Sequence, residues 1–286
     1  MRTRLALPVL LLAAAVLLPA AAQARPVRYY VALGDSLAVG IQPDSAGHSL
    51  TTRQGYADQL FKMERRHFRG LRLVKLGCGG EDTTTIRTNP SACGYGTSRN
   101  QLEAAESFMR KHRKQIAFVT IDIGANDIDG CVGSSGAVDL GCISAGLAST
   151  KRNVPKIARR LRKAGGKHMR ILGMTYYDPF LALYVKGGSS NRSLATASVA
   201  LADQFNGDIA AGYKSQRFKI ADVSKTFETH NTTGRTTLSP YGSIPTDVAR
   251  ICQYTWMCTP APVGPNIHAN RAGYKLIART FARKIK

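Results

Sequence analysis

The chain has 286 residues, with 40 Lys or Arg against 18 Asp or Glu, so its formal net charge is +22. This excess of positive charge favours association with anionic surfaces, which outside a cell are acidic lipids and wall polymers. The basic residues are spread along the chain without a recognised nucleic-acid-binding motif, so we expect no specific nucleic-acid partner. The alternative is that they form only a solvated helix surface.

The N-terminal segment has the order of a secretory signal peptide. Two early arginines precede an apolar run over residues 5–18, and Ala22-Gln23-Ala24 is a small-residue cleavage site. We therefore predict a signal peptide over residues 1–24 and a secreted, extracellular single domain over residues 25–286. No second apolar stretch is long enough to cross a bilayer, so we expect no transmembrane anchor. We expect the mature chain to be a monomer.

Strand-like apolar runs then alternate with helical patterns. Strands are expected over residues 27–33, 71–76, 116–123, 169–175 and 218–223, and helices over residues 56–67, 99–112, 140–164, 191–214 and 270–283. This alternation predicts the α/β class, as a three-layer α/β/α sandwich with a mainly parallel five-stranded sheet. Residues 224–266 are rich in Thr, Gly and Pro, so we expect an irregular segment there that forms a pocket wall.

Six cysteines agree with an oxidising compartment. Their order suggests three local disulfides, although six cysteines allow 15 pairings. A metal site is less favoured, because no Cys-x-x-Cys occurs and the histidines are scattered. The suggested pairs are Cys78 with Cys93, Cys131 with Cys142, and Cys252 with Cys258.

The turn Gly34-Asp35-Ser36-Leu37 directly follows the first predicted strand. The carboxyl ends of strands in open α/β sheets are where ligands bind, so the Ser36 hydroxyl is placed for chemistry. On its own, the tetrapeptide is also compatible with a capped turn that leads into a helix.

Three further motifs follow at other strand ends or before the last helix. They are Gly77-Cys78-Gly79-Gly80, Gly124-Ala125-Asn126-Asp127 and Asn266-Ile267-His268-Ala269-Asn270. Glycines after a strand let backbone N–H groups approach a ligand closely. Together the four motifs supply a nucleophile, polar donors and a base.

In this order, the four motifs resemble the SGNH hydrolases, also called GDSL esterases and lipases. With the signal peptide and the cysteine pairs, the chain is most similar to secreted actinobacterial esterases and lipases of that family. The resemblance implies a flavodoxin-like sheet, hydrolysis of an acyl-ester substrate through an acyl-serine, and no cofactor or metal.

A serine hydroxyl needs an adjacent base, and we predict His268 as that base for Ser36. The backbone N–H groups of Ser36 and Gly80 and the Asn126 amide would form the oxyanion hole. As alternatives, His268 caps a helix or packs in the core, and His48 is the second candidate base. Asn126 is also compatible with a helix cap, and we expect Asp127 to be a cap or a loop brace.

The family usually has an Asp three residues before the histidine, and here that residue is Pro265. We expect the Pro265 backbone carbonyl to orient the imidazole, and the alternative is a carboxylate from elsewhere in the chain. Aromatic and apolar side chains near the predicted edge either line an acyl groove or pack under a disulfide. They are Tyr176, Tyr177, Phe180, Tyr241, Tyr254, Trp256 and Met257.

The sequence therefore predicts a secreted serine esterase or lipase that acts on lipid or small acyl esters. The alternatives on the same site are a carbohydrate acetylesterase and a phospholipase. An alternative of another class is an inactive glycan- or polyanion-binding protein.

Overall fold

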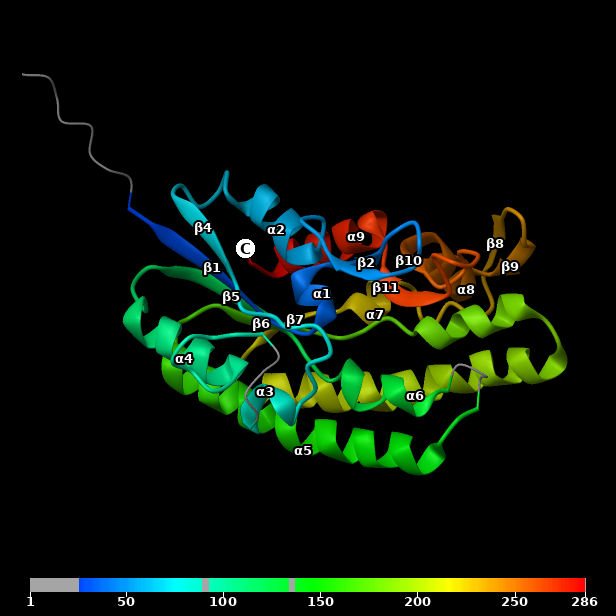
Figure 1. Ribbon diagram of the computed structural model, residues 1–286, viewed down its shortest axis with the longest axis horizontal. Helices are drawn as coiled ribbons and strands as arrows, with labels where there is room; N and C mark the ends of the chain where they lie inside the picture. The colour runs from blue at the N-terminus through cyan, green and yellow to red at the C-terminus, as the bar shows by residue number, and fades with distance from the viewer. Residues whose placement is uncertain (1–25, 89–92, 134–136, 286) are drawn as a thin grey trace, which may run out of the picture.

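The computed structural model describes residues 26–88, 93–133 and 137–285, so the predicted signal peptide lies outside the described residues. In these ranges, five parallel strands form one sheet in the order β4-β1-β5-β6-β7 (Figure 1). The strands are β1 (Arg28–Gly34), β4 (Leu71–Lys75), β5 (Ile116–Asp122), β6 (Ile171–Met174) and β7 (Lys219–Ala221). Each one overlaps a predicted strand, which confirms the predicted sheet.

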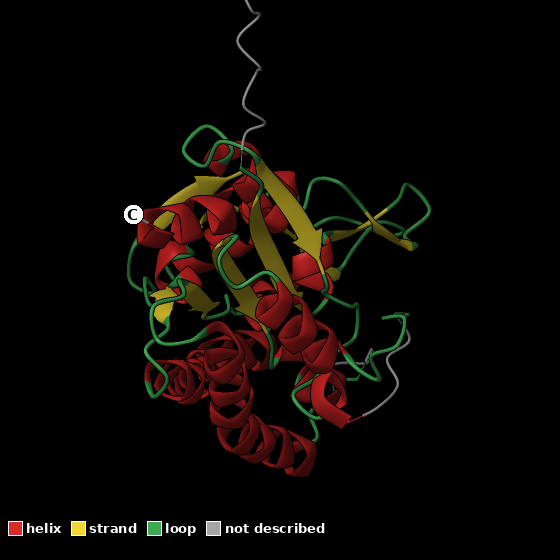
Figure 2. Ribbon diagram, turned by 90° about the vertical axis from the view of Figure 1, so that its left-hand side faces the viewer, coloured by secondary structure: helices red, strands yellow, loops and turns green. Residues whose placement is uncertain are grey.

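Helices cover both faces of this sheet (Figures 1 and 2). One face carries α2 (Tyr56–Glu64) and α9 (Arg271–Ile285), and the other carries α4 (Gln101–Lys111), α5 (Leu140–Gly165) and α6 (Ser189–Lys214). In each helix the buried residues recur mainly at three- and four-residue spacing, as in α5, so one stripe faces the core. The three-layer α/β/α sandwich is confirmed.

Shorter elements fill the connections. They are α1 (Ser36–Val39), β2 (Ile41–Pro43), β3 (Ser49–Thr51), α3 (Thr85–Thr88), η1 (Ala125–Asp127), η2 (Asp129–Cys131), η3 (Pro179–Lys186), α7 (Val223–Thr226), β8 (Arg235–Leu238), β9 (Gly242–Pro245), α8 (Thr246–Tyr254), β10 (Thr255–Trp256) and β11 (Asn266–Ala269).

The prediction of an irregular segment over residues 224–266 is wrong. The segment contains the antiparallel hairpin of β8 and β9, followed by helix α8. Tertiary packing forms this helix, because Val248, Ala249 and Ile251 are buried against the rest of the fold. Nine residues are too few for an apolar stripe to stand out among the surrounding Thr, Gly and Pro.

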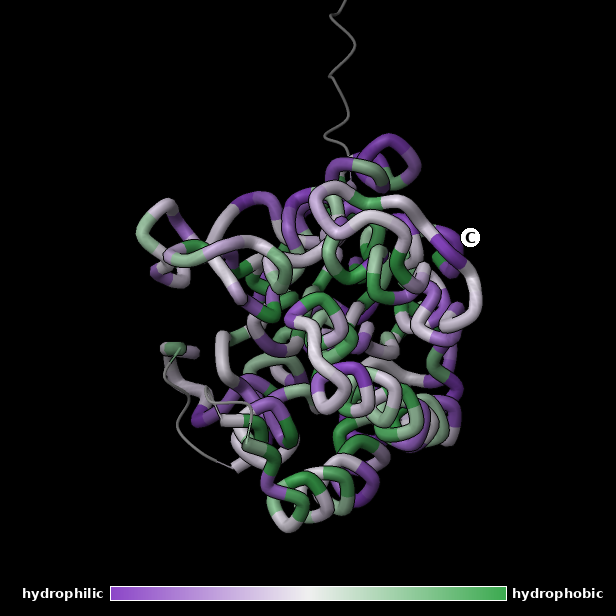
Figure 3. Tube along the Cα trace, turned by 90° about the vertical axis from the view of Figure 1, so that its right-hand side faces the viewer, coloured by the Kyte–Doolittle hydropathy of each residue, from purple (hydrophilic) through white to green (hydrophobic). Residues whose placement is uncertain are grey.

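The core lies between the sheet and its two helix layers. Strand β1 is buried on both of its faces, since Tyr30, Val31, Ala32 and Leu33 are all 0 % exposed. This is why the strand reads as an unbroken apolar run rather than as an alternating one. Figure 3 shows hydrophobic chain gathered in the middle of the molecule, with hydrophilic segments toward its outside.

The three predicted disulfides are all present: Cys78–Cys93, Cys131–Cys142 and Cys252–Cys258. The first holds the loop after β4, the second joins η2 to α5, and the third links α8 to the turn after β10. Within the described ranges, no helix is both long and apolar enough to span a bilayer.

The topology places a crevice at the carboxyl ends of β1 and β5. These strands are neighbours in the sheet, but the chain leaves β1 toward α2 on one face and leaves β5 toward α5 on the other. Ligands of doubly wound α/β folds bind where the connections diverge in this way. The Ser36 and Asn126 motifs follow these two strands.

Candidate active site

Ser36 is the first residue of α1, one residue beyond the tight turn that ends β1. Gly34 has a φ of +129°, and a Cβ there would lie 2.0 Å from the Asp122 carbonyl oxygen. Only glycine permits this approach of β1 to β5. Asp35 then caps the helix, because its Oδ1 accepts a hydrogen bond from the Leu37 N–H at 2.9 Å. The serine is left half-buried at the carboxyl edge of the sheet.

The backbone N–H of Ser36 is free in the described part of the chain, unlike the other amides of α1. The Leu37 N–H donates to Asp35, the Ala38 N–H donates to Asp122 Oδ2 at 3.1 Å, and the last N–H donates to a backbone carbonyl. Helix N-termini present such N–H groups to ligands. Ser36 thus provides both a side-chain hydroxyl and a free backbone N–H at this edge of the sheet.

Two buried carboxyl groups support this turn. Asp35 and Asp122 are 1 % and 0 % exposed, and their side chains are hydrogen-bonded to each other. The Tyr176 hydroxyl donates to Asp35 Oδ2 at 2.8 Å, and the Tyr56 hydroxyl donates to Asp122 Oδ1 at 2.5 Å. Burial raises the pKa of both groups, and the Asp35 charge raises the pKa of Asp122 further. Burial therefore disfavours the charged form of both carboxyl groups, and of Asp122 most strongly.

Asn126 belongs to η1, which follows β5, and it lines the same pocket as Ser36. Its Nδ2 donates to the Glu81 carbonyl oxygen at 2.8 Å. Because a carbonyl only accepts, this bond fixes which end of the amide is nitrogen. The second N–H of Nδ2 has no acceptor within residues 26–88, 93–133 and 137–285, so it is available to a ligand.

Gly80 lies on the loop after β4, exposed and outside the residues that line the pocket. Its φ of +78° is in the left-handed region that favours glycine. The same loop is tied to η1 by Asp127, which accepts from the Thr83 N–H at 2.9 Å and from the Thr83 hydroxyl at 2.7 Å. Asp127 is therefore a loop brace, one of the two structural roles expected for it.

His268 lies on β11, half-buried, and lines the pocket together with Ser36 and Asn126. The Tyr177 hydroxyl donates to the Ile267 carbonyl oxygen at 2.7 Å and so fixes the strand that carries the histidine. The structure thus brings three of the four motifs to one pocket, from segments that are far apart in the sequence.

The Nδ1 atom of His268 faces the side chain of Asn266. Asn266 Oδ1 accepts from the His268 backbone N–H at 3.0 Å and lies 2.7 Å from Nδ1. Because a backbone N–H only donates, the shared atom is the amide oxygen, and Nδ1 must carry a proton to bond with it. Nε2 is then left with the lone pair that a general base needs.

This arrangement corrects the expectation for Pro265. The acceptor of the Nδ1 proton is the Asn266 side chain and not the Pro265 carbonyl. The reason is local, because an Asn oxygen readily reaches the N–H two residues further along, as in an Asx turn. That turn places the oxygen beside the ring. An Asn two residues before the histidine was the signal in the sequence.

Burial lowers the pKa of His268 to about 4. Within the described residues no carboxylate contacts the ring, so no anion offsets the loss of solvation. The imidazole is neutral at neutral pH and ready to accept a proton.

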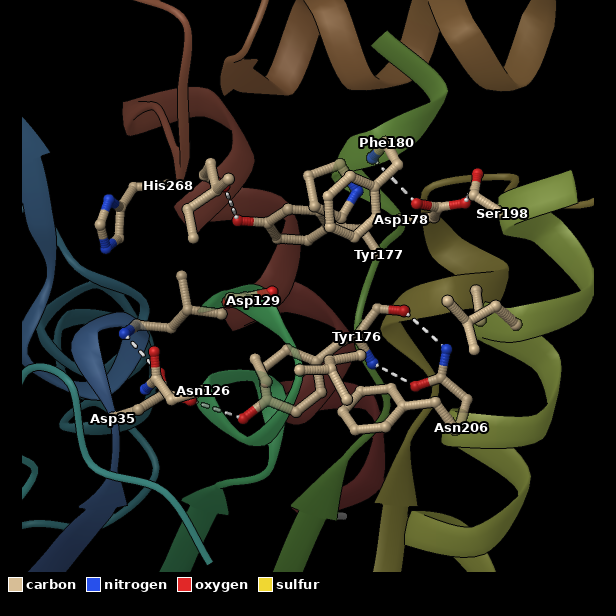
Figure 4. A pocket seen from close by; sticks show the side chains of 18 of the residues that line it. Asp35, Asn126, Asp129, Tyr176, Tyr177, Asp178, Phe180, Ser198, Asn206 and His268 are labelled. Carbon is tan, nitrogen blue, oxygen red and sulfur yellow. Dashed lines mark hydrogen bonds between the residues drawn. The ribbon is translucent and has the colours of Figure 1, made fainter. Parts of the chain in front are cut away.

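The pocket extends from His268 toward α6, and this part is largely apolar (Figure 4). Phe180, Leu201, Ala202 and Phe205 supply its apolar side chains. Of the aromatic and apolar candidates from the sequence, Tyr176, Tyr177 and Phe180 line the pocket, whereas Tyr241, Tyr254, Trp256 and Met257 do not. No residue of the segment 224–266 is among the lining residues, so that segment is not the pocket wall.

Two carboxyl groups in the pocket were not predicted from the sequence. Asp129 lines the pocket and has no hydrogen-bond partner among the described residues, and burial and the Asp35 charge raise its pKa to about 8. Asp178 accepts from the Ser198 hydroxyl at 2.6 Å, and burial raises its pKa to about 6. Figure 4 shows Asp129 between His268 and Tyr176. Asp129 carried no motif, so only the fold could reveal it.

His48, the second candidate base, is not part of the pocket. Its side chain is 78 % exposed and pairs with Asp44 at 3.3 Å. Of the histidines in the chain, only His268 lines the pocket that contains Ser36.

Comparison with known proteins identifies a family and a fold. The model of the GDSL-like Lipase/Acylhydrolase family matches residues 32–276, which span the turn at Ser36 and the strand at His268. A sequence search among curated proteins finds no match.

Solved structures with the same fold include two Streptomyces enzymes. An extracellular lipase from Streptomyces rimosus has a TM-score of 0.55 at 19 % identity, over 90 % of this chain and 99 % of the lipase. Phospholipase A1 from Streptomyces albidoflavus has a TM-score of 0.56 at 16 % identity, over 90 % of this chain and 99 % of the phospholipase. At these identities the likeness concerns the fold.

Proposed function

The chain belongs to the GDSL-like lipase/acylhydrolase family, and we propose that it hydrolyses carboxylic acyl esters with Ser36 as nucleophile and His268 as general base. The observation that carries this proposal is the shared pocket of Ser36, Asn126 and His268, with Nε2 of a neutral imidazole left as the free nitrogen. The enzyme is thus a serine-dependent carboxylic ester hydrolase.

In the acylation step, Ser36 Oγ attacks the ester carbonyl carbon while His268 Nε2 takes the hydroxyl proton. The tetrahedral intermediate collapses, the bond to the alcohol oxygen breaks, and His268 returns the proton to that oxygen. The alcohol leaves and an acyl-serine remains. A water molecule repeats the sequence in the second half: His268 removes its proton, and the acid and free Ser36 are released.

The negative oxygen of each intermediate needs donors that are in place beforehand. The free N–H of Ser36 and the second N–H of Asn126 Nδ2 are two such donors in the described structure. The N–H of Gly80, on the loop after β4, is the third proposed donor. Loss of one donor typically costs about 10²- to 10³-fold in rate.

The Asn266 side chain takes the place of the usual carboxylate as the group that orients the histidine. It fixes the proton on Nδ1 without adding a charge beside the ring. Asn266 therefore acts as a positioning residue, and Ser36 with His268 forms a catalytic dyad.

We assign the acyl group of the substrate to the apolar part of the pocket, between η3 and α6. Phe180, Leu201, Ala202 and Phe205 provide an apolar lining there, and polar groups converge at the opposite end near Ser36. This arrangement supports lipid or small acyl esters as substrates.

We also propose that residues 1–24 are a signal peptide and that residues 25–286 act outside the cell, where disulfides persist.

A fluorophosphonate probe and p-nitrophenyl butyrate test the proposal together. The oxidised protein should bind one equivalent of the probe covalently on Ser36 and hydrolyse the ester. Ser36→Ala should abolish labelling, and His268→Ala should lower both labelling and turnover, because only an activated serine reacts.

His48→Ala serves as the matched control, since His48 is exposed and outside the pocket. This variant should react with the fluorophosphonate probe and hydrolyse p-nitrophenyl butyrate as the unchanged protein does. A folded Ser36→Ala protein with full ester turnover would overturn the mechanism. A folded protein that neither labels nor hydrolyses any ester would instead support the non-catalytic binding alternative.

A further inference from the structure

A basic groove lies between α2 and α9, on the face of the sheet opposite α5. Two hollows that share Met63, Arg66 and Lys275 run along these helices. Figure 1 shows α2 and α9 packed side by side over the sheet, and α9 starts three residues after His268. The groove therefore runs along the helix pair from the end of the molecule that carries the pocket.

The charges of α9 repeat at a regular interval along this groove. Arg271, Lys275, Arg279 and Arg283 are each four residues apart, all four are exposed, and all line the hollows. Four residues correspond to about 6 Å of helix rise and slightly more than one turn, so the charges form a row that winds slowly around the helix, by about 40° at each step. Like charges at this spacing weaken an isolated helix, so helix stability does not account for the row.

The opposite wall of the groove adds further positive charges. Arg53, Lys62 and Arg66 line it from the α2 side and are also exposed. The one carboxyl group among the lining residues belongs to Glu64, which is 3 % exposed. In the described ranges, none of the seven cations forms an ion pair within 4.0 Å of a carboxylate.

Elsewhere in the described ranges, six Lys or Arg side chains are paired with a carboxylate. Lys75 pairs with Asp58 at 2.9 Å, and Arg160 pairs with Glu106 at 2.6 Å. The groove therefore concentrates uncompensated charge within a concave surface, and such a surface attracts anions more strongly than scattered charges do. Arginines supply five of its seven cations, and the planar guanidinium suits phosphate groups.

We propose that the groove between α2 and α9 binds a flexible chain of phosphate groups, and that it does so independently of ester hydrolysis in the pocket. A linear polymer can follow the row on α9, whereas a flat membrane cannot enter a concave groove. The large apolar residues that are exposed in the described ranges, Leu50, Val138, Leu140 and Leu194, are not among the groove lining. The groove thus lacks the apolar anchors of an interfacial site.

Binding of fluorescent long-chain inorganic polyphosphate tests the proposal, with affinity measured from 50 to 300 mM salt, about the range in which phosphate contacts weaken. The groove variant carries Lys62→Gln, Arg66→Gln, Lys275→Gln and Arg279→Gln. The control variant carries Arg152→Gln, Lys156→Gln, Arg159→Gln and Lys163→Gln on the exposed face of α5. Both variants lose four charges, so their net charge is equal.

The groove variant should lose at least about tenfold in affinity and show a shallower dependence on salt, because fewer counterions are released. The control variant should stay within about twofold of the unchanged protein at each salt concentration. Hydrolysis of p-nitrophenyl butyrate should be unchanged in both, which also shows that they fold. Should the quadruple groove variant not fold, the double variant of Lys275→Gln and Arg279→Gln gives the same comparison.

Equal losses in the two variants would overturn the proposal, since only net charge would then matter. Absence of polyphosphate binding by the unchanged protein would overturn it as well. Vesicles of phosphatidylglycerol form a second arm. If the protein binds these vesicles but does not bind polyphosphate at the same salt concentration, the basic residues bind a lipid surface and the proposed polymer ligand is wrong.

Discussion

Asn266 Oδ1 accepts hydrogen bonds from both the backbone N–H and the Nδ1–H of His268, at 3.0 and 2.7 Å. The first bond identifies the Asn atom as oxygen, and the second bond then fixes the tautomer of the ring. In the proposed mechanism, a neutral amide thus performs the orienting part of the task that a carboxylate performs in a Ser-His-Asp triad. It provides no negative charge to stabilise the imidazolium that forms during catalysis.

Asn266→Ala should lower kcat by about 10- to 100-fold with little change in KM, because the proton is no longer held on Nδ1 while the substrate contacts remain. Steady-state kinetics with p-nitrophenyl butyrate measure this split. Asn270→Ala is a neighbouring control that removes a structural amide, which donates to the Gln253 carbonyl. Equal kcat values for Asn266→Ala and the unchanged enzyme would show that the ring is oriented by another group.

The sequence was sufficient to predict the sheet and the long helices, because strongly apolar strands and amphipathic helices dominate those segments. The order of the six cysteines was sufficient to suggest the disulfides. It also identified Ser36, Asn126 and His268 as candidates through their motifs. The orienting group was predicted wrongly at Pro265, because the acceptor is the Asn266 side-chain oxygen and its conformation cannot be read from the sequence. Asp129 was missed because its burial and its proximity to Asp35 arise from packing.

The acid side of the pH profile should lie unusually low. The proposed base acts as neutral imidazole, and burial lowers the pKa of His268 to about 4, so kcat/KM should fall only as the pH approaches 4. Asn266→Asp places a carboxylate beside the ring, which should raise this pKa by about 1–3 units. Profiles of both proteins from pH 3.5 to 8 test the shift. An acid limb near pH 6.5 in the unchanged enzyme would contradict the burial of the base.

The free energy of unfolding should also depend on the protonation of His268. The pKa of His268 is lower in the folded protein than in the unfolded chain, where it is about 6.5. The contribution of the neutral ring to the free energy of unfolding is therefore fully present above pH 6.5. That contribution is lost as the pH falls toward 4. The difference in unfolding free energy between the unchanged protein and His268→Gln should therefore depend on pH in this window. A difference that is constant from pH 7 to 4 would argue against the lowered pKa.

Asp129 should control the alkaline side of the profile. Its pKa is raised to about 8, so it is protonated at neutral pH and ionises above pH 8, which puts a negative charge in the pocket where an oxyanion must form. Asp129→Asn should match the unchanged enzyme at pH 6 and exceed its kcat/KM several-fold at pH 9, after correction for spontaneous hydrolysis. Glu228→Gln, at a half-buried ion pair with Arg250 outside the pocket, is a charge-matched control. If kcat/KM has the same pH dependence in the unchanged enzyme and in Asp129→Asn, Asp129 does not control the alkaline side of the profile.

Tyr176 should contribute to stability through its bond to the buried Asp35. Tyr176→Phe removes the hydroxyl that donates to Asp35 Oδ2 at 2.8 Å and leaves a buried carboxyl short of one donor, at a cost of about 1–3 kcal/mol. Tyr241→Phe removes a bond to the neutral Cys258 carbonyl at 3.0 Å and should cost less, about 0.5–1.5 kcal/mol. Urea unfolding measures both. The Tyr176 loss should grow as the pH rises, because the missing donor disfavours the ionised form of Asp35. A smaller loss for Tyr176→Phe than for Tyr241→Phe would contradict this role of the Tyr176 hydroxyl.

Ala202 should decide how long an acyl chain the pocket accepts. It lines the apolar part of the pocket on α6, so Ala202→Trp fills that part while Ser36 and His268 are left in place. The variant should keep most of its activity toward p-nitrophenyl acetate and lose at least about tenfold in kcat/KM toward p-nitrophenyl octanoate, since an acyl chain excluded from an apolar site forfeits about 0.8 kcal/mol per buried CH₂. Ala200→Trp introduces the same side chain at an exposed position of the same helix, outside the pocket, and should change neither substrate. If Ala202→Trp lowers activity toward both esters by the same factor, the acyl chain does not bind between η3 and α6.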